Sequence, residues 1–305
     1  MGSGRWSSAD WGAYSASHVA GKAQTQVFTA RSMKDEFNPA MIQVRESRDS
    51  ADNPASTPVI LASDVTGSMG MVAHALMKDG LNTLATEIYD RRPVSDPHIM
   101  VMAVGDARSD RAPLQATQFE ADIRLADQVR SLWLEGNGGG NNGESYCGAH
   151  VFAATRTVTD AWEKRRRKGY LFTIGDEPVH DGMRQEELQR VFGKDFGRDL
   201  SARECVEMAS KTYEVFHVVL RNEGYAAGDL KRVLDTWNPI LPQRVILLDD
   251  YRKLAEAVVS TIQVVEGARK ADVAASWSGD TSLVVANAIK DIAQRGPAGG
   301  AVRLA

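Results

Sequence analysis

The sequence predicts an α/β fold: a doubly wound, mostly parallel sheet flanked by helices, of the Rossmann-like kind. Apolar runs of strand length occur at residues 58–62, 98–104 and 169–174, and strand patterns follow at 213–220 and 244–248. Between these runs the apolar residues follow helical spacing. Each of the first three runs ends in a polar turn with an aspartate, namely Asp64, Asp106 and Asp176. Strands that alternate with helices are typical of a parallel, doubly wound sheet.

The first 57 residues predict an N-terminal extension, or arm. Ser, Ala, Gly, Asp and Arg are frequent in it, and residues 47–58 have the composition of a loop or linker. The arm also carries several aromatic residues, for which we expect packing against the main domain or onto a partner: Trp6, Trp11, Tyr14 and Phe28.

Residues 58–266 predict the main domain. After the Asp64 turn, Val72, Leu76, Leu84 and Ile88 share one helical face. The remaining expected elements are a short edge strand at 117–119, helices at 119–133, about 145–166 and 251–266, and two short helical stretches within 184–210.

Residues 267–305 predict a C-terminal tail. An amphipathic helix is expected after Asp280, with Val285, Ile289 and Ile292 on its apolar face, and Gly296-Pro297 would end it.

Composition and charge exclude several classes of partner. The chain has 305 residues and a net charge of −4, so no general attraction to nucleic acid or to an anionic membrane is expected. No apolar run reaches the roughly 18 residues of a membrane span. The N-terminus lacks the apolar core of a signal peptide, and two cysteines offer no disulfide framework. We therefore expect a cytoplasmic protein. The one basic run, at 164–168, is expected to place favourable charge at a helix C-terminus.

A carboxylate and two hydroxyls stand at alternate positions after the first strand, at Asp64, Thr66 and Ser68. Alternate residues that leave a strand end can converge on one point. Their oxygen atoms are hard ligands, which suit Mg²⁺, Mn²⁺ or Ca²⁺ better than zinc. Gly67 lets the backbone turn tightly between the two hydroxyls. In open α/β sheets, ligands bind at the edge formed by the carboxyl ends of the strands, which is where Asp64 lies.

This Asp-x-Thr-x-Ser spacing resembles the metal-ion-dependent adhesion site of von Willebrand factor A (vWA) domains, whose usual form is Asp-x-Ser-x-Ser. The resemblance covers residues 59–266. It implies that Asp64, Thr66 and Ser68 form the first metal loop and that Asp176 supplies the third-loop aspartate. The family's Thr-Asp-Gly context is replaced here by Ile-Gly-Asp-Glu, so the match at Asp176 rests on its position after a strand.

The second metal loop of the family normally supplies a threonine. Here residues 140–145 resemble the loop of integrin β subunits in which a glutamate serves the metal. This likeness implies Glu144 as a ligand, with Asn142 or Ser145 as substitutes. If Glu144 binds the metal directly, it fills the open coordination position; if it acts through water, the position stays open.

Other chemistries fit the sequence less well. A phosphoryl-accepting Asp64 would need a second aspartate where Thr66 stands. A zinc site from Cys147, His150 and His180 competes with the alternative that Cys147 and His150 are buried helix residues. The sequence shows no nucleophile elbow, Walker loop or dinucleotide fingerprint.

We therefore expect a binding module and not an enzyme, holding Mg²⁺ (or Mn²⁺ or Ca²⁺) and contacting a protein partner through an acidic side chain of that partner. The resemblance implies an adaptor in a multiprotein assembly, including assemblies run by AAA+ ATPases. The alternatives are a metal-dependent hydrolase that uses the same acidic edge and a purely structural assembly subunit.

Overall fold

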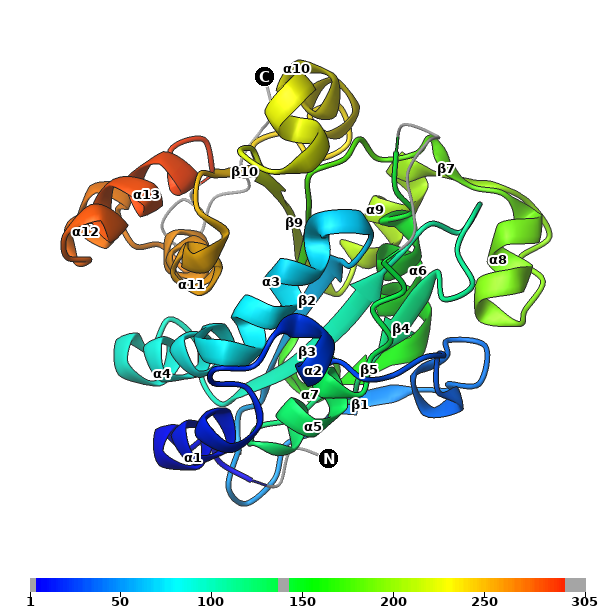
Figure 1. Cartoon of the computed structure of the whole chain (residues 1–305). Helices are drawn as coiled ribbons and strands as arrows, with labels where there is room; N and C mark the ends of the chain where they lie inside the picture. Colours follow the sequence, from blue (N-terminus) through cyan, green and yellow to red (C-terminus); the bar gives the residue numbers. More distant parts are fainter. Residues whose placement is uncertain (1–3, 137–142, 294–305) are drawn as a thin grey trace.

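The computed structural model describes residues 4–136 and 143–293, and Figure 1 shows a sheet with helices packed on both faces. The described residues contain a six-stranded sheet in the order β10-β9-β6-β2-β3-β4. All neighbouring strands in it run parallel except β3 and β4. The predicted fold class is therefore confirmed. The strands are β2 (Thr57–Asp64), β3 (Pro97–Val104), β4 (Leu114–Ala116), β6 (Gly169–Gly175), β9 (Tyr213–Leu220) and β10 (Val245–Leu248).

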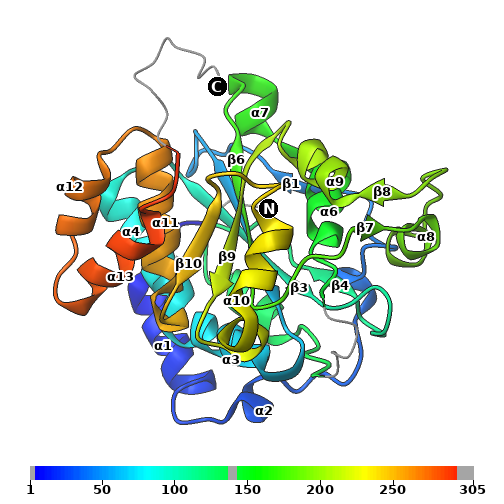
Figure 2. The same cartoon turned by 90° about the horizontal axis from the view of Figure 1, so that it is seen from above.

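Both faces of the sheet are buried, which explains the continuous apolar runs in its strands. Side chains alternate along β2, so Val59 and Leu61 join one hydrophobic cluster and Ile60 and Ala62 join the other. Figure 2 shows the two helical layers on either side of the sheet.

The first hydrophobic cluster lies under helices on one face. These are α1 (Ser8–His18), α2 (Gln24–Val27), α3 (Gly70–Ala75), α4 (Leu81–Arg91), α5 (Arg124–Arg130), α11 (Leu254–Val265), α12 (Lys270–Ala275) and α13 (Asp280–Ile289). A π-helical turn, η3 (Leu76–Gly80), joins α3 to α4, and short 3₁₀ helices are η1 (Asp35–Phe37), η2 (Gly67–Met69) and η4 (Tyr251–Lys253).

The second cluster lies under helices on the opposite face. These are α6 (Cys147–Arg156), α8 (Gln185–Phe192), α9 (Ala202–Ala209) and α10 (Gly224–Trp237). Two small strand pairs flank this layer: β1 (Arg45–Ser47) with β5 (Thr157–Thr159), and β7 (Gly182–Met183) with β8 (Leu200–Ser201).

The arm packs against the main domain. Trp11 is buried in the first cluster, and the Tyr14 hydroxyl donates to Asp127 Oδ1 at 2.7 Å. In the tail, α13 buries Val285 and Ile289 in the same cluster, as its predicted amphipathic pattern requires. Within the described residues, no helix is long and apolar enough to cross a membrane.

Three local predictions were wrong. The single helix expected at about 145–166 is divided into α6 and α7 (Asp160–Arg165) by strand β5. β-Branched residues at 157–159 favour a strand, and pairing with β1 provides the partner. The edge strand lies at 114–116 and not at 117–119, and α5 begins at Arg124.

Helix α10 had no counterpart among the predicted elements. It begins at Gly224 and buries Ala226, Val233 and Trp237, whose spacing is helical. The helix matters for the site because its first turn contacts Asp176.

Candidate metal centre at the carboxyl edge of the sheet

Asp64 is the last residue of β2 and is fully buried. Its Oδ1 accepts two hydrogen bonds from Thr66, one from the backbone N–H at 2.7 Å and one from the hydroxyl at 2.6 Å. Its Oδ2 accepts a bond from the Tyr146 hydroxyl at 3.3 Å. The first two predicted ligands therefore lie in direct contact at the end of the central strand.

The turn after Asp64 has the geometry that the glycine was expected to allow. Gly67 has φ +44°, a left-handed conformation that side chains rarely adopt. Ser68 follows it within the 3₁₀ helix η2. The side chain of Ser68 and the whole of Asn142 lie outside the described part of the structure.

Asp176 follows β6, the strand that pairs with β2 on one side. Ser63 is in register with Ile174, so both chains leave the sheet at the same edge. Asp176 Oδ2 accepts a hydrogen bond from the backbone N–H of Tyr225, at the start of α10, at 2.5 Å. A side chain at Gly224 (φ +32°) would collide with this carboxylate, so glycine is required there.

Glu144 is buried beside the segment that follows β6. Its backbone N–H donates to Pro178 O at 3.0 Å, and its Oε1 accepts from the N–H of Ser145. The hydroxyl of Ser145 is directed elsewhere, because it donates to Asp106 Oδ1 at 2.8 Å. His180 Nε2 lies 3.2 Å from the same oxygen.

Asp106 fits the capping explanation of acidic strand ends. It follows β3 and accepts from the backbone N–H of Arg108 at 3.1 Å and from the Ser109 hydroxyl at 3.2 Å. Asp64 likewise accepts from the backbone N–H two residues on, so what distinguishes Asp64 and Asp176 from Asp106 is that they lie at the ends of the two central strands.

Asp64, Glu144 and Asp176 are buried at this edge without a neighbouring opposite charge among the described residues. Burial raises the pKa of Asp64 to about 8; the hydrogen bonds from Thr66 lower it, and the negative charges of Asp176 and Glu177 raise it further. Burial and the charge of Asp64 also raise the pKa of Glu144 well above its usual range. The pKa of Asp176 is raised by burial as well. Within the described residues, none of these carboxylates forms an ion pair.

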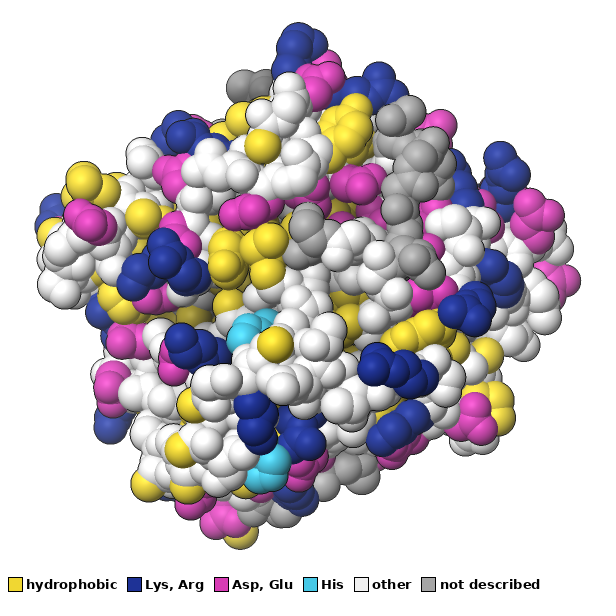
Figure 3. Space-filling view, in the orientation of Figure 1, with side chains coloured by type: hydrophobic (Ala, Val, Ile, Leu, Met, Phe, Trp, Pro, Cys, Tyr) yellow, Lys and Arg dark blue, Asp and Glu magenta, His cyan; other side chains and the backbone are white. Residues whose placement is uncertain are grey.

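These donors fit a hard divalent cation. Asp64 and Asp176 supply carboxylate oxygens and Thr66 a hydroxyl, which is the ligand chemistry that Mg²⁺, Mn²⁺ and Ca²⁺ prefer. A cation would favour the ionised carboxylates, which burial alone disfavours. Across the described residues, no three His, Cys, Asp or Glu side chains form a metal-binding group, so the three predicted carboxylates Asp64, Glu144 and Asp176 do not form one. The other two predicted ligands, Thr66 and Ser68, carry hydroxyls. Figure 3 shows acidic side chains exposed beside α10 on this edge.

Within the described residues, Cys147, His150 and His180 form no metal-binding group. Cys147 and His150 are buried in α6, and Cys147 interacts with Cys205 of α9. His180 instead contacts Asp106. Cys147 and His150 are therefore packing residues of the second cluster layer.

Sequence patterns did not indicate Tyr146. It is fully buried, and its hydroxyl contacts Asp64 from the start of α6. Its ring lies 5.1 Å from that of His217 and 5.3 Å from that of Trp237, measured between centroids. Nothing in its spacing from Glu144 and Ser145 singles it out, because the contact exists only once α6 packs on the sheet.

Comparisons with known proteins identify no family for the chain. No protein-family model matches the chain, and no curated protein sequence matches it. Solved structures that resemble it include two crystal structures of the pilus adhesin SpaC from Lactobacillus rhamnosus GG, one in an open conformation. They are 9% and 10% identical, each with a TM-score of 0.40 over 72% of this chain. The chain spans about a third of the adhesin, at 31% and 32% of its length.

Proposed function

We propose that this chain is a vWA-type binding module that contacts a protein partner through a divalent cation. The ion, preferentially Mg²⁺ and otherwise Mn²⁺ or Ca²⁺, would be held by Asp64, Thr66, Ser68 and Asp176. Glu144 would be a further ligand or would contact the ion through a water molecule. By the same resemblance, we propose a cytoplasmic adaptor in a multiprotein assembly, of the kind run by AAA+ ATPases, and no enzymatic activity.

One observation carries the proposal: two carboxylates at the ends of the adjacent central strands β2 and β6 are buried together without a cationic side chain. A structural role alone would favour paired or hydrogen-bonded carboxylates, because burying an uncompensated charge is costly. Each of the two has some hydrogen bonds, from Thr66 and Tyr225, yet the pKa of each is still raised.

The ligand count explains why a partner would be recognised. Two carboxylates neutralise a divalent ion, and hydroxyls bind without adding charge. Mg²⁺ prefers six oxygen ligands and otherwise keeps waters in the free positions. When bound, the ion would offer such a position to an aspartate or glutamate of the partner. The surfaces of the chain and its partner around the ion must also be complementary, because desolvating that carboxylate is costly.

Thermal unfolding with Mg²⁺, Mn²⁺, Ca²⁺ and Zn²⁺ tests the metal site. A metal at ten times its dissociation constant stabilises the fold by about 1.4 kcal/mol. Asp64→Ala should abolish the shift in melting temperature. Asp250→Asn is the matched control, since Asp250 follows β10 at the same edge and caps η4. A response to Zn²⁺ alone, or an unchanged Mg²⁺ shift in Asp64→Ala, would refute the assignment.

Partner binding is tested by affinity purification from the native host. EDTA should release the partner, Mg²⁺ should restore it, and Asp64→Ala should fail to bind it. Thr66→Ala should weaken binding without unfolding the domain, because it removes one neutral ligand. A partner that stays bound through chelation and in Asp64→Ala would instead favour the structural-subunit alternative, with contacts on the arm or tail.

A further inference from the structure

A small cavity lies at the amino edge of the sheet, the edge where β2 and β6 begin. Its volume is about 190 Å³, and its walls come from segments 55–57 and 92–95, the chain that links α7 to β6, and Glu266 at the end of α11. Four basic side chains line it: Arg92, Arg165, Arg167 and Lys168.

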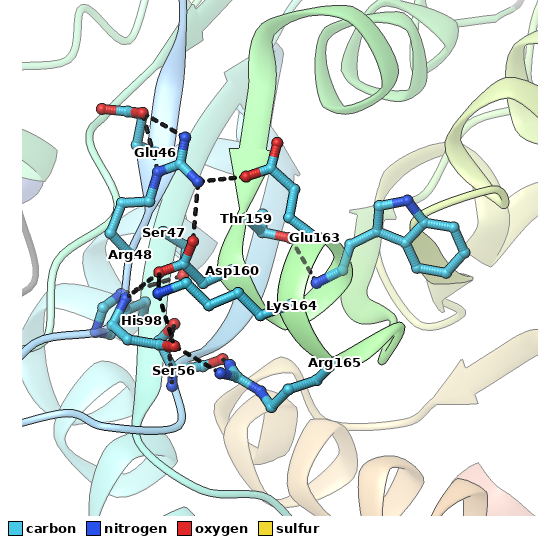
Figure 4. Close-up of polar contacts among 12 residues, drawn as sticks. Glu46, Ser47, Arg48, Ser56, His98, Thr159, Asp160, Glu163, Lys164 and Arg165 are labelled. Atoms are coloured by element: carbon cyan, nitrogen blue, oxygen red, sulfur yellow. Dashed lines mark hydrogen bonds and ion pairs between the residues drawn. The ribbon is translucent and has the colours of Figure 1, made fainter.

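Two of these four cations are paired with carboxylates of the protein. Arg165 Nη1 lies 2.7 Å from Asp49 Oδ2, and its Nη2 donates to the carbonyl of Ser56 at 2.7 Å. Figure 4 shows Arg165 extending toward the segment that carries Ser56. Arg167 Nη2 lies 2.6 Å from Glu266 Oε2.

The other two cations are uncompensated. The side chains of Arg92 and Lys168 make no hydrogen bond or ion pair with any described residue, although Lys168 is only half-exposed. Ser95 adds a hydroxyl to the same wall. The cavity therefore presents two positive charges and a hydroxyl donor that the fold itself does not use.

The helix-terminus explanation of the basic run does not account for Lys168. Helix α7 ends at Arg165, and Lys164 and Arg165 lie in its last turn. Favourable interaction of a cation with the helix dipole falls off within that turn. Lys168 lies three residues past the helix end, directly before β6, so its position needs another reason.

We propose that this cavity binds a small phosphate-bearing anion. A phosphate monoester carries a charge of about −1.5 to −2 at pH 7, which matches two uncompensated cations, whereas a single carboxylate would leave one unmatched. Arginine offers planar pairs of N–H donors and lysine a point charge, and both bind phosphate. A volume of 190 Å³ is below the roughly 300–1,000 Å³ of most small-molecule sites, so the cavity suits a phosphate group and not a whole dinucleotide.

Calorimetric titration of the full chain tests this, with inorganic phosphate and glycerol 3-phosphate as separate probes. All titrations contain EDTA, so that the carboxyl edge plays no part. Saturable binding of either probe is expected, and a tighter glycerol 3-phosphate would identify a monoester as the natural ligand class. Binding should weaken as NaCl is added, because salt screens the charges.

Two variants and one matched control sharpen the test. Arg92→Gln and Lys168→Gln should each weaken binding by about tenfold or more, the effect of losing a charged hydrogen-bond donor. Arg166→Gln should leave it unchanged: Arg166 belongs to the same basic run but lies outside the cavity lining, over the ring of Trp162.

Three outcomes would overturn the proposal. They are no saturable binding of either probe, equal weakening in Arg166→Gln, and full affinity in the folded Arg92→Gln/Lys168→Gln double variant. Asp64→Asn should bind phosphate normally, so failure at one edge is distinguishable from failure at the other.

Discussion

At the amino edge of the sheet, the carboxylates of Asp49 and Asp160 are paired with cations, whereas at the carboxyl edge the buried carboxylates of Asp64 and Asp176 are not. Asp49 accepts from Arg165 at 2.7 Å, and Asp160 lies 2.9 Å from Arg48 Nη1 and 2.6 Å from Lys164 Nζ. Figure 4 shows this network, which joins the arm to α7. Asp64, by contrast, is bonded only to neutral groups.

The pKa values of Asp49 and Asp64 consequently shift in opposite directions. Burial alone would raise the pKa of Asp49, but the hydrogen bonds from Arg165 and Ser56 hold it well below its usual range. At Asp64 burial prevails, and the pKa rises to about 8. The difference indicates that the paired charges at the amino edge stabilise the fold. The Asp64 carboxylate at the carboxyl edge has no oppositely charged partner, and a bound cation could take that place.

The largest expected effect comes from neutralising one carboxylate at each edge, in metal-free protein at pH 8.5. Asp49→Asn should lower the free energy of unfolding by about 2 kcal/mol, because it breaks charged hydrogen bonds. Asp64→Asn should raise it. An acid whose folded pKa is raised destabilises the fold progressively as pH rises from about 4 to about 8.

Urea unfolding measures both values. The pH dependence separates them further: the contribution of Asp49 is present above pH 4 and lost as pH falls below it, since the folded pKa is depressed. If both variants lose stability equally at pH 8.5, the contrast between the edges does not hold.

A smaller effect on the free energy of unfolding should come from replacing His150, which lies beneath the carboxyl edge. It is fully buried, neither ring nitrogen has a hydrogen-bond partner among the described residues, and burial lowers its pKa to about 4. Its stabilising contribution is complete above pH 6.5 and is lost as pH falls toward 4. His150→Leu should therefore lose roughly 1 kcal/mol less than the wild type between pH 7 and 5.5.

Urea unfolding at the two pH values measures this change, with His18→Gln on α1 as the control. Identical pH dependence in His150→Leu and the wild type would show that His150 does not titrate as its burial requires.

The smallest effect is expected from Glu144→Gln. If Glu144 caps the metal, the neutral side chain should weaken Mg²⁺ binding a few-fold while partner affinity holds or rises, since the open position is exposed. Calorimetric titration with Mg²⁺ measures the metal affinity, and a binding assay at saturating Mg²⁺ measures the partner affinity. Glu135→Gln is the control, because Glu135 binds the Arg111 and Ala112 backbone at the other end of the same loop. No change in either quantity would show that the integrin-like alignment of this loop is wrong.

Local patterns were sufficient for the parallel sheet and most of its helices. Runs such as residues 98–104 are apolar throughout because both sheet faces are covered, so their strand character is visible without tertiary information. The spacing of Asp64 and Thr66 also fixed their contact, since only Val65 separates them. The division of the 145–166 helix was not visible, because β5 depends on pairing with β1, more than a hundred residues earlier in the chain.

The sequence by itself determined the fold class, the carboxyl-edge position of Asp64 and Asp176, and the amphipathic face of α13, because each follows from periodicity within one segment. Only the tertiary structure decided that Tyr146 contacts Asp64, that α10 donates to Asp176, and that Arg92 and Lys168 share a cavity. These contacts join segments far apart in the chain. Their distances depend on how helices pack on the sheet, which no local spacing encodes.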